Sequence, residues 1–143
     1  MRVALGADHA GIELKSALAA HLKAAGHEVA DLGTHGPESV DYPDFARAVA
    51  TSVARGDADR GLLVCGTGQG MAMSANKVPG VRAAVVADTF SARMTMMHND
   101  ARVLCLGARV VGQGLAKDIV DEWMGATFEG GRHASRVAKM EGA

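Results

Sequence analysis

Residues 61–77 read GLLVCGTGQGMAMSANK, and this stretch decides the fold. It begins with an uninterrupted apolar run, which is typical of a strand that is buried on both faces in a parallel sheet. Alternating glycines follow at Gly66, Gly68 and Gly70, and the residues from about 70 to 77 predict a short helix. A strand, a glycine loop and a helix in this order indicate a ligand-binding turn of an α/β protein.

The alternation of short apolar runs and longer helical patterns continues in both directions. Leu14, Leu18 and Leu22 recur on one face of a predicted helix, and Gly26 predicts its end. We therefore expect a doubly wound parallel sheet in a single domain spanning residues 1–143, with a C-terminal helical tail from about residue 126. The expected strands are 2–7, 27–33, 61–66, 81–88 and 102–107, and the expected helices are 12–26, 44–55, 70–77, 89–98 and 114–124.

The composition excludes several classes of protein. The chain has 143 residues, a net charge of −1 and no run of Lys or Arg, so it has no electrostatic footprint for nucleic acid or a membrane surface. No apolar stretch approaches the roughly 20 residues of a membrane span, and the N-terminal run is too short for a signal peptide. Cys65 and Cys105 form no metal-binding or disulfide pattern. We expect a cytoplasmic protein with free thiols.

The glycine loop does not fit the common nucleotide-binding motifs. The dinucleotide fingerprint G-x-G-x-x-G would need a glycine where Met71 stands, and it belongs to the first strand–helix turn rather than the third. No Gly-Lys-Ser/Thr follows, which excludes a Walker A loop. Because ligands of doubly wound sheets bind outside the carboxyl ends of the strands, we expect the loop to present its backbone N–H groups to an anionic oxygen there.

Cys65 stands where the predicted third strand ends, next to this donor-rich loop. Such a position favours a thiolate, which acts as a nucleophile or as a general base. A nucleophile would need a histidine and an orienting amide, which His98 and Asn99 could supply. A base would need oxyanion donors nearby, which the loop could supply. Cys105 lies inside the fifth predicted strand and is interpreted as a small buried apolar residue.

Two further groups of side chains suggest ligand binding. His9 and His98 both fall at junctions between predicted elements. Arg132 and Arg136 are four residues apart, so they share one face of a helix. A pair of arginines can grip a phosphate through charge-assisted, bidentate hydrogen bonds, and Arg109 follows the fifth predicted strand near the same edge.

Five motifs, in the same order along nearly the whole chain, resemble those of type B ribose-5-phosphate isomerases. They are ADHAG (7–11), DYPDFA (41–46), CGTGQG…SANK (65–77), HND…VLCLGARVVG (98–112) and GGRH…RV (130–137). The resemblance implies a Rossmann-like three-layer α/β/α fold with a five-stranded parallel sheet. It also implies a homodimer or a dimer of dimers, no metal or other cofactor, and interconversion of ribose 5-phosphate and ribulose 5-phosphate in the pentose phosphate pathway.

The resemblance also assigns roles to residues of this chain. Cys65 matches the base that takes the C2 proton; a second branch of the family uses a glutamate after the glycine loop, where this chain has no carboxylate. Thr67 and His98 would assist opening of the furanose ring, with His98 as the acid. Binding of the enediolate, the hydroxyls and the phosphate, shared between two subunits, would fall to Asp8, His9, Tyr42, Gly66, Gly68, Gln69, Gly70, Asn99, Arg109, Arg132 and Arg136.

Other functions remain open from the sequence alone. The same mechanism could act on allose 6-phosphate, galactose 6-phosphate or erythrulose 4-phosphate, depending on the pocket length set by residues 33–43 and the tail arginines. A nucleotide-binding regulatory module would explain the glycines but not Cys65 together with His98. A cysteine hydrolase would use Cys65, His98 and Asn99 but would leave the arginines without a role. A purely structural dimer module predicts that Cys65→Ala changes no activity.

Overall fold

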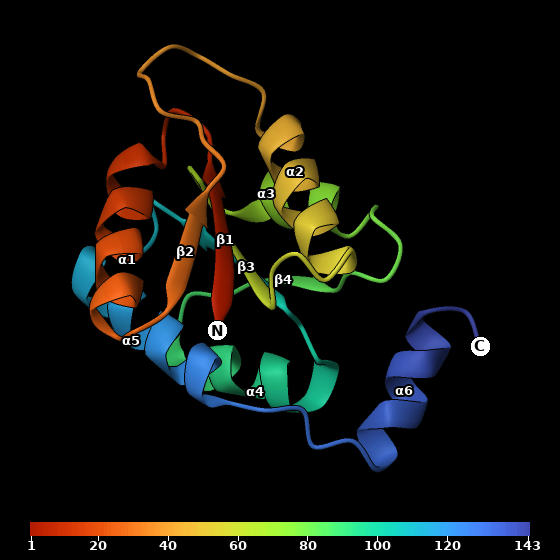
Figure 1. The fold of residues 1–143 in the computed structure, drawn as a ribbon. Coiled ribbons are helices and arrows are strands. Elements are labelled where there is room, and N and C mark those ends of the chain that lie inside the picture. The colour runs from red at the N-terminus through yellow and green to blue at the C-terminus, as the bar shows by residue number, and fades with distance from the viewer.

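The computed structural model describes residues 1–143 and contains one parallel sheet between two layers of helices (Figure 1). The strand order is β2-β1-β3-β5-β4, which confirms the expected three-layer α/β/α fold. The strands are β1 (Arg2–Ala7), β2 (Glu28–Asp31), β3 (Arg60–Cys65), β4 (Ala83–Val85) and β5 (Val103–Gly107), and the helices are α1 (Ile12–Ala24), α2 (Tyr42–Ala54), α3 (Gln69–Ala75), α4 (Thr89–Asn99), α5 (Gln113–Gly125) and α6 (Arg132–Met140).

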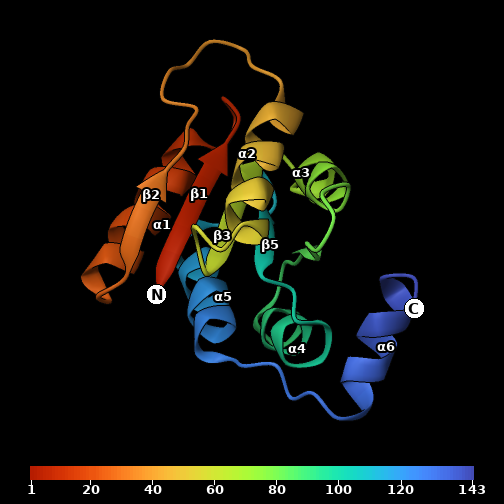
Figure 2. The same ribbon diagram turned by 45° about the vertical axis from the view of Figure 1, so that its right-hand side comes forward.

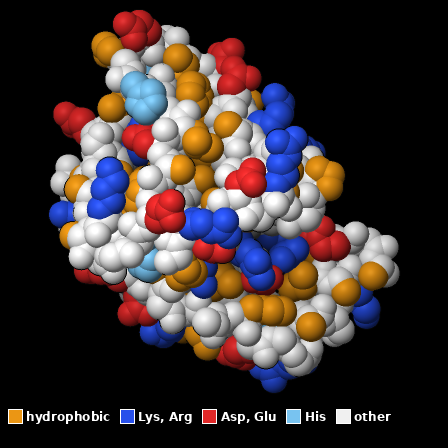
Figure 3. All heavy atoms as spheres, in the orientation of Figure 1, with side chains coloured by type: hydrophobic (Ala, Val, Ile, Leu, Met, Phe, Trp, Pro, Cys, Tyr) orange, Lys and Arg blue, Asp and Glu red, His pale blue; other side chains and the backbone are white.

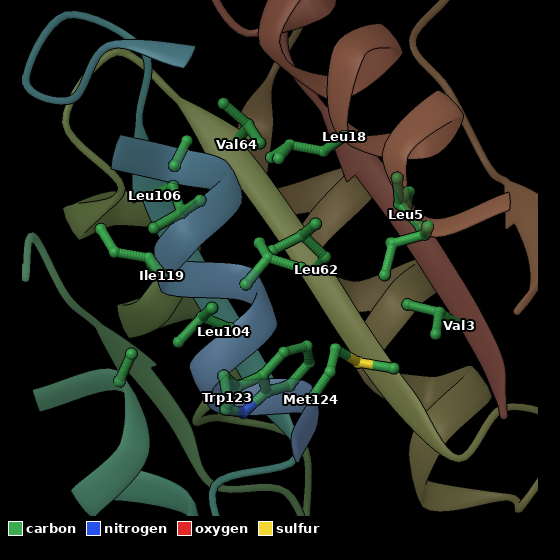
Figure 4. Close-up of a cluster of buried hydrophobic side chains, with 14 of the residues drawn as sticks. Val3, Leu5, Leu18, Leu62, Val64, Leu104, Leu106, Ile119, Trp123 and Met124 are labelled. Carbon is green, nitrogen blue, oxygen red and sulfur yellow. The ribbon is translucent and has the colours of Figure 1, made fainter. Parts of the chain in front are cut away.

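The central strand β3 shows why the sequence folds into layers. Successive side chains of a strand point to opposite faces, and every residue of β3 is buried. Leu62 and Val64 pack in the layer of α1, α4 and α5, while Leu63 and Cys65 pack in the layer of α2 and α3. Figure 4 shows the first of these cores, in which Trp123 of α5 lies under the sheet. Burial on both faces explains the uninterrupted apolar run.

Some boundaries differ from the predictions at the edges of the sheet. β4 covers only Ala83–Val85 rather than 81–88, because this edge strand pairs on one side only, with β5. β2, the other edge strand, is likewise shorter than expected. α2 begins at Tyr42 rather than near residue 44, since Pro43 in the first turn already has a helical φ and needs no N–H partner there. Gly26, with φ +91°, follows the end of α1 as predicted.

The strand order creates a topological switch point between the carboxyl ends of β1 and β3. β1 leads into α1 on one face of the sheet, whereas β3 leads into α3 on the other (Figure 2). Ala7 pairs with Val64, so the residues that follow the two strands are neighbours. Ligands of doubly wound sheets bind at such a switch point. The fold therefore selects the ADHAG and CGTGQG segments as one site.

The C-terminal helix α6 belongs to neither layer. It packs against α4 and stands apart from the sheet at the lower right of Figure 1. The predicted tail helix thus exists, although it starts at Arg132 rather than directly after residue 126. None of the helices combines the length and apolar character that crossing a membrane requires.

Candidate active site

Cys65 ends β3 at the switch point of the sheet. Its side chain is almost completely buried, and its Sγ accepts a hydrogen bond from the N–H of Gly68 at 3.1 Å. The loop can turn back toward the sulfur because Gly68 adopts φ +80°, a conformation that residues with a side chain rarely adopt. A Cβ on Gly68 would also lie 2.8 Å from Val85 Cγ2. The backbone conformation of one glycine therefore fixes the sulfur beside the loop.

The loop after Cys65 carries free backbone donors. The N–H groups of Gly66, Thr67 and Gly70 donate to no group within the chain, whereas the N–H of Gln69 donates to Thr67 Oγ1 at 3.3 Å. Successive N–H groups that lack partners form a concave site for a negatively charged oxygen. Thr67 is exposed on the rim, and its own hydroxyl proton is free to donate to a ligand.

Tyr42, the first residue of α2, lies directly on the glycine loop. A Cβ on Gly70 would stand 2.3 Å from Tyr42 Cε1 and 2.9 Å from the hydroxyl oxygen. Only a glycine allows the ring to approach the backbone this closely. The absence of a side chain at Gly70 therefore brings an aromatic hydroxyl from a distant part of the chain to the site.

Asp8 and His9 directly follow the end of β1 at the same edge of the sheet. Asp8 is buried, and its Oδ1 accepts the N–H of Ala10 at 3.0 Å, which fixes the turn into α1. His9 is exposed, and its Nδ1 accepts the N–H of Val40 at 3.2 Å. With Nδ1 as the acceptor, Nε2 carries the ring proton and is a donor at the surface. The same bond links the loop that leads to Tyr42 to the segment that follows β1.

Arg109 reaches the loop from the end of β5. Its N–H donates to the carbonyl of Gly66 at 3.0 Å, and its side-chain Nε lies 3.9 Å from the point where a Cβ on Gly66 would stand. The guanidinium is exposed beside the loop. The carboxyl edge of the sheet thus gathers these predicted residues: Asp8, His9, Tyr42, Cys65, Gly66, Thr67, Gly68, Gln69, Gly70 and Arg109.

The remaining predicted residues lie at the opposite end of the sheet. α4 runs antiparallel to the strands, so its last turn, with His98 and Asn99, reaches the amino edge. Asp100, the next residue, lines a hollow together with Arg60, the first residue of β3. β3 rises about 3.3 Å per residue, so its two ends are roughly 16 Å apart. His98 therefore does not reach Cys65 within one chain, and a single chain holds no Cys–His–Asn hydrolase triad.

His98 is part of a cluster that the sequence did not reveal. Its ring stacks on that of His133, with centroids 4.2 Å apart and planes inclined by 10°. Glu129 places Oε1 3.9 Å from His98 Nε2 and Oε2 3.5 Å from His133 Nε2. Burial is the main cause that lowers the pKa of His133, followed by the neighbouring His98 and Arg132. The four-residue spacing of Glu129 and His133 was the only signal, and it is a weak one.

Arg132 and Arg136 lie exposed on α6 and form no ion pair within the chain. Between α6 and the body of the molecule the surface is hollowed, and basic side chains gather there in Figure 3. This hollow of about 530 Å³ is lined by Lys77, Arg82 and Asn99 among others. Unpaired guanidinium groups on a helix that leaves the sheet are available to a ligand or to another chain.

The largest hollow of the molecule does not coincide with either group of residues. It measures about 710 Å³, lies between α4 and α5, and is lined by the carboxylates of Asp118, Asp121, Glu122 and Glu129 and by Arg93. Its excess of negative charge opposes the binding of an anionic ligand. The chemistry of the side chains, rather than the size of the hollow, identifies the site.

Comparison with known proteins places the chain in one family. The sequence model described as Ribose/Galactose Isomerase matches residues 3–140. Ribose-5-phosphate isomerase B of Escherichia coli is 51% identical over 136 residues, which cover 95% of this chain and 91% of that protein.

Solved structures agree with the sequence comparison. Ribose-5-phosphate isomerase B of Clostridium thermocellum matches with a TM-score of 0.97 and 56% identity, over 99% of this chain and 95% of that one. The Mycoplasma genitalium protein, solved with bound ribulose-5-phosphate, matches with a TM-score of 0.94 and 43% identity, over 98% and 93%. The chain with Cys65 at the mouth of its glycine loop belongs to the ribose/galactose isomerase family.

Proposed function

We propose that this protein is a ribose-5-phosphate isomerase, which interconverts ribose 5-phosphate and ribulose 5-phosphate through a cis-enediolate. The observation that carries the proposal is the position of Cys65, whose buried sulfur lies beside free backbone N–H groups at the switch point of the sheet. A base next to oxyanion donors is what an aldose–ketose isomerase needs. Membership of the family, including a relative solved with bound ribulose-5-phosphate, supports this substrate.

The reaction begins with opening of the furanose ring. His98 gives a proton to the ring oxygen, the bond between C1 and that oxygen breaks, and the electron pair of the bond stays on the oxygen. The C1 hydroxyl loses its proton to water and becomes the carbonyl of the open aldose. The hydroxyl of Thr67, already an acceptor for the N–H of Gln69, donates to the sugar. Ring opening exposes the C2 hydrogen as an acidic position next to a carbonyl.

Proton transfer then takes place at Cys65. The thiolate takes the proton from C2, the C1 carbonyl oxygen becomes an enediolate oxygen, and the N–H groups of Gly66, Thr67 and Gly70 bind it. Cys65 then returns its proton to C1, O2 loses its proton, and O1 takes up a proton, which gives the ketose with a C2 carbonyl and a C1 hydroxyl. A positioned base contributes roughly 10²–10⁴-fold, and each oxyanion donor about 2.7–4 kcal/mol.

We infer further that one site takes residues from two copies of the chain. Cys65 lies at the carboxyl edge, whereas His98 and Asn99 lie at the amino edge and Arg132 and Arg136 on the outlying α6. A homodimer in which α4 and α6 of one copy face the carboxyl edge of the sheet of the other would complete the site. The arginines would then grip the phosphate with Arg109 and His9, far from the reacting carbons, where binding energy serves orientation.

The biological setting follows from the same substrate. An enzyme of this activity belongs to the pentose phosphate pathway, and a chain with free thiols fits the cytoplasm. The whole chain, residues 1–143, would act as one isomerase domain, from which α6 projects. The steps above call for no metal or organic cofactor: a thiol, an imidazole and water move the protons, and backbone N–H groups bind the oxyanion.

The decisive experiment combines a substrate assay with subunit complementation. We expect wild type to turn over ribose 5-phosphate faster than allose 6-phosphate or erythrulose 4-phosphate. Cys65→Ala and His98→Ala should each be inactive alone. After the two are unfolded and refolded together, mixed dimers should contain one intact site and recover part of the activity.

The outcomes distinguish the two parts of the proposal. Preference for another sugar phosphate would change the substrate but keep the mechanism, and no turnover of any would overturn the activity. Recovery in the refolded mixture, with none in the separately refolded variants, would support a shared site. If wild type is active but the mixture recovers nothing, each site is built from a single chain.

A further inference from the structure

His133, in the first turn of α6, carries a buried nitrogen that forms no hydrogen bond. Nε2 of His133 is inaccessible to solvent and forms no hydrogen bond, although Glu129 Oε2 lies 3.5 Å away, and it is the sole buried side-chain nitrogen or oxygen atom without a hydrogen bond in the chain. Buried polar atoms are nearly always paired in folded proteins. The ring of His133 nevertheless lies buried on an otherwise exposed helix, with its face against His98.

The surroundings of His133 favour the neutral form of its ring. His98 faces it from α4, Glu129 from the preceding loop, and Arg132 and Arg136 from α6 itself. Burial, His98 and the two arginines lower the pKa of His133, and Glu129 alone opposes them. Two charged imidazoles in a stack would repel each other. His133 therefore lies against His98 as a flat ring, and the Glu129 carboxylate lies 3.9 Å from Nε2 of His98.

A metal ion does not account for the cluster. The ligand atoms of His98, Glu129 and His133 do lie within 4.8 Å of one another. However, the lone pair of an imidazole nitrogen points along the plane of its ring, and these two planes are stacked at 10°. Two such lone pairs do not converge on one ion. The stacked geometry therefore suits a ring that supports His98 better than it suits a metal site.

We propose that His133 and Glu129 are positioning residues that set the orientation of His98 for opening of the sugar ring. His133 supplies a flat neutral surface that fixes the ring plane of His98. Glu129 fixes the rotation within that plane, because its carboxylate lies beside the Nε2 that gives up the proton. The inference rests on the proposed function, in which His98 is the acid of this step.

This role predicts a defect in one chemical step only. Ribose 5-phosphate is mainly a closed furanose and must be opened before its C2 proton can be taken. Ribulose 5-phosphate is acyclic, because the C5 hydroxyl that would close a furanose onto C2 carries the phosphate. Removal of its C1 proton by Cys65, and exchange of that proton with solvent, need no ring opening. Positioning of His98 therefore matters for turnover of the aldose but not for this exchange.

The test uses the full-length protein and measures both steps. Turnover of ribose 5-phosphate gives kcat and KM, and the loss of the C1 proton signal of ribulose 5-phosphate in D2O gives the exchange rate. The variants are His133→Ala, His133→Phe and Glu129→Gln. Glu122→Gln is the matched control, since Glu122 is a similarly exposed carboxylate that pairs with Arg93. Thermal melts and the mass of the assembly verify that each variant folds.

We expect His133→Ala to lower kcat on ribose 5-phosphate by about tenfold to a hundredfold, the scale of a misplaced catalytic group. Its exchange rate should stay within about twofold of wild type, because Cys65 is untouched. His133→Phe restores a flat ring and should recover most of the lost kcat. Glu129→Gln should show a smaller loss of the same kind, and Glu122→Gln none.

Three results would overturn the proposal. The first is full turnover in a folded His133→Ala, which would make the stack irrelevant to the reaction. The second is an equal loss of turnover and exchange, which would indicate a general disturbance of the site. The third is a Phe variant no better than the Ala variant. If wild type itself shows neither turnover nor exchange, the proposed function fails, and this result is distinct from the others.

Discussion

The two ends of the sheet are built in opposite ways. At the carboxyl edge, Cys65 is buried and its loop is held by backbone contacts to β5 and α2. At the amino edge, His98 is half-buried and its neighbours Arg132 and Arg136 lie on a helix that touches little besides α4. One chain can thus hold the base rigidly by itself. His98, Arg132 and Arg136 lie away from Cys65, and in the proposed homodimer they would serve the site of the other copy.

The largest effect should come from the carboxyl edge. Cys65→Ala should fold normally and lose turnover by roughly 10²–10⁴-fold, the contribution of a positioned base. Cys105→Ala is the matched control: that thiol is fully buried inside β5, and burial raises its pKa, so it is chemically inert. Steady-state assays of both variants test this, and an active Cys65→Ala would remove the base from the mechanism.

A smaller effect should follow from moving the loop without touching the sulfur. A Cβ on Gly107 would stand 2.8 Å from the backbone of Thr67. Gly107→Ala should therefore shift the loop and lower kcat by about tenfold to a hundredfold. Gly114→Ala, in α5, meets no atom within 4 Å and should leave activity intact. Loss of activity in both, or in neither, would show that the fit of the loop on β5 is not what positions it.

On α6, the change Arg136→Ala should mainly raise KM. A charge-assisted hydrogen bond contributes about 1.5–3 kcal/mol, so KM should rise roughly tenfold or more while kcat changes little. Lys139→Ala removes a positive charge from the same helix and serves as the control. A fall in kcat at unchanged KM would assign Arg136 to the chemical step instead of to phosphate binding.

The smallest effect concerns the anchor of the loop that carries Tyr42. Lys15 is 2% exposed, and its Nζ binds Asp31 Oδ1 at 2.5 Å and the carbonyl of Thr34 at 2.8 Å. Asp31→Asn leaves this ammonium without its counterion. We expect a loss of about 1–2 kcal/mol in unfolding free energy, below the figure for a fully buried pair, because Asp31 is partly exposed.

The pH dependence of this loss supplies the control. Partial burial raises the pKa of Asp31, but the hydrogen bonds from Lys15 and Gly33 outweigh it and lower the pKa. The pair therefore stabilises the fold above the unfolded-state pKa of about 4, and this stability is lost as the pH falls through the folded-state value. Urea unfolding should show a constant difference at neutral pH that shrinks below about pH 4. A difference independent of pH would point to packing rather than charge.

Most of the fold was predictable because the pattern is local. The apolar run of β3, the leucines four residues apart in α1 and the stop at Gly26 indicated the elements and the α/β class. The edge strands were predicted too long, since a strand paired on one side ends where its partner does, and the sequence does not show pairing. The strand order β2-β1-β3-β5-β4 could not be predicted from local patterns either, because it depends on which strands pair in the folded protein.

The candidate site divides in the same way. A cysteine at a strand end before alternating glycines is a local signal, and the chain alone determined that Cys65 would meet backbone donors. Only the tertiary structure decided that His98 lies at the far edge and that Glu129 and His133 surround it. Helix length and direction carry His98 across the sheet, and α6 then folds back on α4. The residue types of a local motif can be read from the sequence, whereas the distances between residues of separate elements are fixed only when those elements pack together.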